Sequence, residues 1–182
     1  MISREEAMEL VEKNMSNKNL IKHVLAVEAI MRALARKFDQ DEQRWGLAGL
    51  LHDLDYESTG GTPEKHGYVT LDILDGTDVP EEVKHAILAH AGQVQRDSLM
   101  DKAIYCSDPV TGLIVASALM HPTKSLSGMD TDFIGRRFKE KRFAAGADRE
   151  AISTCSDLGM ELQDFLELSL NAMDEISQQL GL

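Results

Sequence analysis

The stretch WGLAGLLHDLD, residues 45–55, predicts the end of a helix that carries an adjacent histidine and aspartate. This helix starts near Asp41, and the spacing of its apolar residues places His52 on the apolar face. The small and polar residues of Ser58–Gly61 then break the helical pattern. We therefore expect His52 and Asp53 to close a helix beside a loop, with their side chains turned inward.

On both sides of this stretch, apolar residues recur at helical spacing, and runs of alternating β-branched residues are absent. A chain of 182 residues is long enough for one substantial core and short for two independent domains. The sequence therefore predicts an all-α fold, a single domain over 1–182 of roughly eight or nine helices joined by short loops. The expected helices are one opened by the capping box Ser3-x-x-Glu6, then about 17–38, 41–52, 62–75, 80–90, 100–120, 131–143, 148–158 and 160–180.

Six ionisable residues fall on the apolar faces of these expected helices: His23, His52, Asp53, His66, His90 and Asp108. Taking an ionised carboxylate out of water is costly unless a charge or good hydrogen bonds compensate it. No lysine or arginine occupies a matching inward position on these helices. The pattern therefore predicts a metal centre.

Imidazole and carboxylate ligands suit Zn, Fe, Mn, Co or Ni, and Mg is a further candidate. The six candidate ligands include no cysteine, and we expect Cys106 and Cys155 to be core residues, which argues against a thiolate-rich structural zinc site. Six ligands exceed the need of one tetrahedral ion, so we expect one or two ions, with Asp53 as the natural bridge between two. Paired ions would lower the pKa of a bridging water and neutralise charge on a phosphoryl group.

The composition of the chain excludes some classes of binding partner. The formal net charge of -12 opposes bulk nucleic-acid binding, which depends on lysine and arginine. Two cysteines without disulfide-scaffold spacing fit a reduced, cytoplasmic protein. The first residues read as a capped helix, and no stretch is expected to be long and apolar enough to span a bilayer, so no membrane partner is predicted.

The residues also resemble a known family, the HD-domain superfamily of metal-dependent phosphohydrolases, whose pattern is H, an adjacent HD, and D. The matching segments, within about 18–120, are KHVLAV with His23, LHDLD with His52 and Asp53, and YCSD with Asp108. The resemblance implies that these four residues hold a first metal. It also implies that Asp53, His66 and His90 hold a second, as in dinuclear members that include dinucleoside polyphosphate hydrolases.

Two departures from the superfamily's pattern stand out. Ser107 and Pro109 flank Asp108, where relatives more often have small apolar and acidic neighbours. Leu54 follows the HD doublet, where cyclic-dinucleotide phosphodiesterases often have glycine, so that subgroup is disfavoured.

Each further candidate for a role in the site could instead have a purely structural role. Asp55 is, with Asp53, a candidate catalytic residue, as a general base or as an orienting residue, although an acid after a helix end is often solvated. Thr111 would hydrogen-bond a metal-bound oxygen or only its own backbone. Substrate phosphate would be clamped by Lys124, Arg136 and Arg137, unless they lie on a solvated face.

The sequence thus predicts a phosphohydrolase that cleaves a phosphate ester or anhydride of a small molecule, a nucleotide by preference, through metal-activated water. The alternatives are an HD-type diiron oxygenase and a non-catalytic module that binds metal or nucleotide for regulation. Residues 123–182 are expected to cover the core and to shape the substrate pocket or a dimer contact, which leaves a homo-oligomer open.

Overall fold

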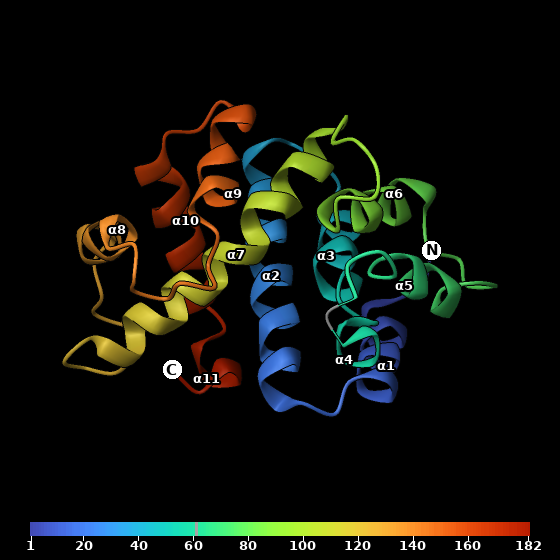
Figure 1. The fold of residues 1–182 in the computed structure, drawn as a ribbon, viewed down its shortest axis with the longest axis horizontal. Coiled ribbons are helices and arrows are strands. Elements are labelled where there is room, and N and C mark those ends of the chain that lie inside the picture. Colours follow the sequence, from blue (N-terminus) through green and yellow to red (C-terminus); the bar gives the residue numbers. More distant parts are fainter. Residues whose placement is uncertain (61) are drawn as a thin grey trace.

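The computed structural model describes residues 1–60 and 62–182, and within them the chain is helical with no strand (Figure 1). The all-α fold class is confirmed. The helices are α1 Arg4–Asn14, α2 Lys18–Lys37, α3 Glu42–Leu51, α4 Tyr56–Thr59, α5 Tyr68–Ile73, α6 Glu81–His90, α7 Leu99–Met120, α8 Thr131–Lys139, α9 Arg149–Ser153, the 3₁₀ helix η1 Thr154–Leu158, α10 Leu162–Asp174 and α11 Ser177–Leu180.

Side-chain caps define where the longer helices begin. Ser3 and Glu6 form the expected capping box of α1, and Ser98 forms a second one with Asp101 at the start of α7. The side chains of Asn17 and Asp41 cap α2 and α3. These caps satisfy backbone N–H groups that a helix leaves unpaired, and they fix the elements that carry the site.

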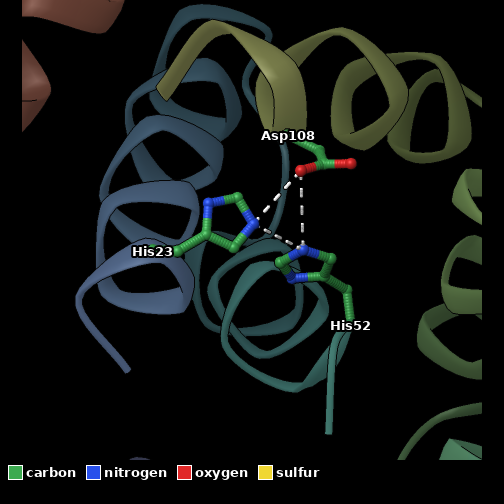
Figure 2. A group of neighbouring side chains, drawn as sticks. All are labelled: His23, His52 and Asp108. Atoms are coloured by element: carbon green, nitrogen blue, oxygen red, sulfur yellow. Dashed lines mark hydrogen bonds and ion pairs between the residues drawn. The ribbon is translucent and has the colours of Figure 1, made fainter. Parts of the chain in front are cut away.

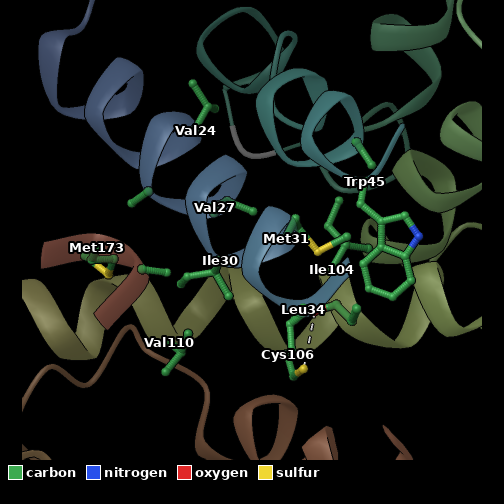
Figure 3. Packing of buried hydrophobic residues seen from close by; sticks show 14 of the residues in the cluster. Val24, Val27, Ile30, Met31, Leu34, Trp45, Ile104, Cys106, Val110 and Met173 are labelled. Atoms are coloured by element: carbon green, nitrogen blue, oxygen red, sulfur yellow. Dashed lines mark hydrogen bonds between the residues drawn. The ribbon is translucent and has the colours of Figure 1, made fainter. Parts of the chain in front are cut away.

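The core lies where α2 crosses α3 and α7. Figure 3 shows Met31 and Leu34 of α2 packed beside Trp45 of α3 and Ile104 of α7. Helices α1 and α3 to α6 lie on one side of α2 in Figure 1, and α8 to α10 lie on the other. The two long helices α2 and α7 thus form the frame against which α3, α6, η1 and α8 to α11 pack, whereas α1 packs on α3 and α5 packs on α6.

The long helix α7 differs from one expectation. Its 22 residues are long and apolar enough, by length and composition alone, to cross a membrane, although no stretch was expected to be. A buried core helix passes the same test, and 56% of this helix's apolar window is buried. Packing against α2, α6, α9 and η1 accounts for its composition.

Other differences concern helix bounds. The expected helix from Thr62 begins only at Tyr68, because 63–67 form turns and Gly67 has φ +84°, a left-handed conformation. His66 therefore lies in a turn, and placing it on a helix face with Val69 and Ile73 was wrong. The three C-terminal helices are shorter or divided, as α8, α9 with η1, and α10 with α11. Of the break predicted at 58–61, Ser58 and Thr59 belong instead to the short helix α4, and Gly61 lies outside the described residues.

Candidate metal centre

The six predicted ligands come together from five segments of the fold. His23 projects from the second turn of α2, and His52 and Asp53 directly follow α3. His66 lies in the turn before α5, His90 is the last residue of α6, and Asp108 lies mid-way along α7. Figure 2 shows three of them, His23, His52 and Asp108, pointing at one another from α2, the end of α3 and α7.

Each of the four histidines has its Nδ1 atom beside a hydrogen-bond acceptor. His52 and His90 face the backbone oxygens of Gly49, at 2.8 Å, and of Ile87, each three residues earlier. His66 faces Asp55 Oδ1 at 2.7 Å, and His23 faces Thr111 Oγ1 at 3.0 Å. An N–H on Nδ1 leaves the Nε2 lone pair available, which is the arrangement of metal-binding histidines.

The Nε2 atoms meet in two pairs. His23 and His52 bring theirs within 3.3 Å, and His66 and His90 bring theirs within 3.1 Å. Two unprotonated nitrogens cannot hydrogen-bond each other, so each pair needs a proton or a cation between its members.

The carboxylates of Asp53 and Asp108 add oxygen ligands to the two pairs of imidazoles. Asp53 Oδ2 lies 3.5 Å from Nε2 of both His23 and His52, whereas its Oδ1 lies 3.4 Å from His66 and 3.5 Å from His90. Asp108 Oδ1 adds a contact of 3.1 Å to His23. One position therefore has two imidazoles and two carboxylate oxygens, and the second has two imidazoles and one. This donor set fits one or two divalent ions.

Burial and charge give the site unusual acid–base properties. Burial alone would lower the pKa of His23, but Asp108 and Asp53 outweigh it and raise the pKa to about 10. Burial lowers the pKa of His52 to about 4. Burial opposes ionisation of Asp53 and Asp108, yet the neighbouring histidines hold the pKa of both below its usual value. Without a metal, the proton on His23 supplies the positive charge that these carboxylates require.

Asp55 is fully buried, unlike the solvated acid that its sequence position allowed. Its Oδ1 accepts from His66, and its Oδ2 accepts from the backbone N–H groups of Gly67 and Thr70 at 2.7 and 3.1 Å. With both oxygens engaged in this way, Asp55 is placed to orient His66 and not to take a proton from water. Thr111 acts likewise, donating to the Asp108 carbonyl at 2.8 Å while it faces His23.

A cavity of about 420 Å³ opens on the ligands. Its wall also includes Pro109, which departs from the superfamily's pattern, and residues that the sequence did not single out, namely Leu20, Tyr56, Tyr105, Gly146, Asp148 and Ala151. Tyr56 packs edge-on against His66, and the guanidinium of Arg96 lies 3.8 Å from the ring centre of Tyr105. No spacing pattern links these residues, since they come from different segments of the chain, among them α2, α4, α7 and the loop before α9.

The predicted phosphate clamp does not reach this cavity. Lys124 and Arg136 are exposed, and neither they nor Arg137 line it. Arg137 instead pairs with Glu140 and lies over the rings of Phe133 and Phe143, because α8 turns this basic face toward its own loop. The structure thus does not bring these three residues to the cavity wall, and their role as substrate ligands stays a prediction.

Comparison with known proteins identifies the family. The model of the HD domain matches residues 20–124, more than half of the chain, so the chain belongs to the HD domain family. This membership confirms the resemblance drawn from the His and Asp motifs, and it places the chain in a superfamily of metal-dependent phosphohydrolases.

Two curated relatives share distant similarity with the chain. Ribonuclease Y of Oleidesulfovibrio alaskensis is 24% identical over 137 residues, which cover 74% of this chain and 26% of the relative. Ribonuclease Y of Sulfurovum sp. is 25% identical over 135 residues, which cover 72% of this chain and 26% of that relative. The chain thus spans about a quarter of the length of these relatives. No solved structure matches the chain.

Proposed function

We propose that the protein hydrolyses a phosphate ester or anhydride of a small molecule, a nucleotide by preference, at a centre of one or two divalent metal ions. The observation that carries this proposal is the division of Asp53, whose two oxygens face two different pairs of imidazoles. Hydrolytic relatives with an HD domain support it.

Each residue has a defined part in this proposal. His23, His52, Asp53 and Asp108 would hold the first ion, and Asp53, His66 and His90 the second. Bound ions would supply a hydroxide near neutral pH and neutralise charge on the phosphoryl group. Thr111 and Asp55 hold the rings of His23 and His66 in position, so that the ligands need little rearrangement.

The test is a metal analysis combined with a phosphatase screen. Purified protein would be loaded separately with Mn, Fe, Co, Ni, Zn and Mg, and phosphate release would be measured from p-nitrophenyl phosphate, a nucleotide panel and a short RNA. We expect bound metal and turnover of small phosphate esters. His52→Ala should abolish both, whereas His121→Ala, at the C-cap of α7 and outside the cavity lining, should change neither.

Two outcomes would overturn the proposal. Protein that retains no metal, or metal-loaded protein that releases phosphate from no substrate, would contradict it. Substrate-dependent oxygen uptake by iron-loaded protein would indicate a diiron oxygenase, and tight nucleotide binding without turnover would indicate a regulatory module.

A further inference from the structure

Beside the ligands, the wall of the cavity carries one further charged group. Among the described residues, no lysine or arginine lines the cavity, and the ionisable group contributed by the C-terminal part of the chain is the carboxylate of Asp148. Arg96 stands over Tyr105 but is not part of the lining. Phosphate-binding sites for polyphosphates ordinarily add basic side chains or backbone cradles to the metal ions.

The formal charges at the proposed centre limit how much negative charge of a substrate the cavity can neutralise. Two divalent ions bring four positive charges, of which Asp53 and Asp108 cancel two and Asp55, behind His66, cancels a third. The imidazoles are neutral when they bind metal. The one positive charge that is left is less than the charge of a single phosphomonoester, and Asp148 opposes any further anion.

The position of Asp148 is fixed by its neighbours. Its Oδ1 caps α9 by accepting from the N–H groups of Glu150 and Ala151, at 2.8 and 3.2 Å. The adjacent Arg149 donates to several backbone oxygens of the preceding loop, including those of Ala144 and Ala147 at 2.7 Å. Arg149 thereby holds the loop that brings Gly146 and Asp148 to the cavity.

We infer that Asp148 is a specificity-determining residue that restricts the site to phosphomonoesters whose remaining part is uncharged, such as a nucleoside monophosphate, and rejects polyphosphates and RNA. This inference rests on the proposed function. The carboxylate acts through repulsion of additional phosphate groups, so its effect depends on the charge of the substrate and not on the chemical step.

The experiment compares AMP with ATP in the metal-loaded protein and in Asp148→Asn and Asp148→Ser, since asparagine and serine also cap helices and keep α9 intact. The control is Asp130→Asn, which alters an equivalent cap at α8 outside the cavity lining. We expect the parent protein to have a higher kcat/KM for AMP than for ATP. In both Asp148 variants the ratio of these two kcat/KM values should fall about tenfold, mainly because activity on ATP increases. Asp130→Asn should leave the ratio unchanged.

Binding gives a second readout that does not require turnover. Calorimetry with a non-hydrolysable phosphonate analogue of AMP and a methylene-bridged analogue of ATP should show the same change in preference. Equal use or binding of AMP and ATP by the parent protein, or an unchanged ratio in both variants, would overturn the role of Asp148. Absence of cleavage of every substrate would instead overturn the proposed function, and the binding ratio would still decide the role of Asp148.

Discussion

At the scale of single residues, the site depends on what stands behind each ligand. Backbone oxygens orient His52 and His90, while side chains orient His23 and His66. Side-chain partners can be changed by mutation without altering any ligand, so their contribution is measurable.

Asp55→Asn provides the first such test. The amide can still accept from His66, but it brings an N–H₂ group toward the N–H groups of Gly67 or Thr70. We expect affinity for the second ion to fall about 10- to 100-fold, the usual effect of losing a partner behind a metal ligand. Titration with Mn followed by metal analysis would measure it.

The matched control is Asp72→Asn, an exposed aspartate on nearby α5. It should bind metal like the parent protein. A second-ion affinity that is unaffected in Asp55→Asn would show that His66 needs no such support.

Proton release is a second prediction at this scale. The pKa of His23 is raised to about 10 in the metal-free site, so this residue is protonated at neutral pH and must lose its proton to bind metal. Affinity for the first ion should therefore rise with pH, by about tenfold per pH unit below the pKa of His23. Calorimetry in Tris and HEPES, whose ionisation enthalpies differ, should show about one proton released. Affinity that is constant between pH 6 and 9 would contradict the prediction.

The candidate metal ligands could be predicted from the sequence, whereas the positions of the residues that support the site could not. His23, His52, Asp53 and Asp108 could be selected because inward positions on helices follow from periodicity. The burial of Asp55 depends on a turn at Gly67 with positive φ, and Asp148 reaches the cavity through a loop held by Arg149. Neither arrangement has a periodic signal.

At the scale of elements, the close contact of α2 with α3 sets the distance between His23 and His52. A Cβ atom added at Gly49 would lie 2.8 Å from the backbone N and Cα of Glu28. Backbone atoms cannot move aside as a flexible side chain can, so the glycine permits this approach.

Gly49→Ala should therefore force the two helices apart. We expect a loss of about 1–3 kcal/mol in the free energy of unfolding, typical of overpacking, with weaker metal binding. Gly112→Ala on α7 is the control, because its added Cβ meets its nearest neighbour at 3.9 Å. Chemical denaturation should show the control unchanged or stabilised by up to about 1 kcal/mol. Equal stability of the two variants would exclude the steric explanation.

Helices with clear signals were predicted closely. The caps of α1, α2 and α3 lie where the sequence placed them, and α6 ends at His90 as expected. The turns at 63–67 were missed because Thr62-Pro63 is also a good start for a helix. Gly67 favours turns over a helix through its positive φ, which depends on its three-dimensional surroundings.

At the scale of the whole molecule, the ligands join segments that are far apart in the chain. His23 and Asp108 are separated by 85 positions, and each lies on one of the two helices that form the frame. An ion that binds only the folded arrangement stabilises the entire domain, since the unfolded chain does not bring these ligands together.

Metal loading should accordingly raise the melting temperature. At a free metal concentration about 1,000 times Kd the gain is about 4 kcal/mol, or on the order of 10 °C for a chain of this size. Differential scanning calorimetry with Mn, and again after EDTA, would measure the shift. His121→Ala should show the full shift and His52→Ala little of it. A melting temperature independent of metal in the parent protein would contradict the prediction.

The division of Asp53 between two pairs of imidazoles has a consequence for how such a centre fills. An ion bound at the first pair would fix the carboxylate and so prepare the oxygen that faces the second pair, but it would also withdraw charge from that oxygen. The fixed carboxylate would favour the second ion and the withdrawn charge would disfavour it, so the two positions would not bind ions independently. Binding isotherms would then show cooperativity of either sign, which Asp53→Asn should abolish.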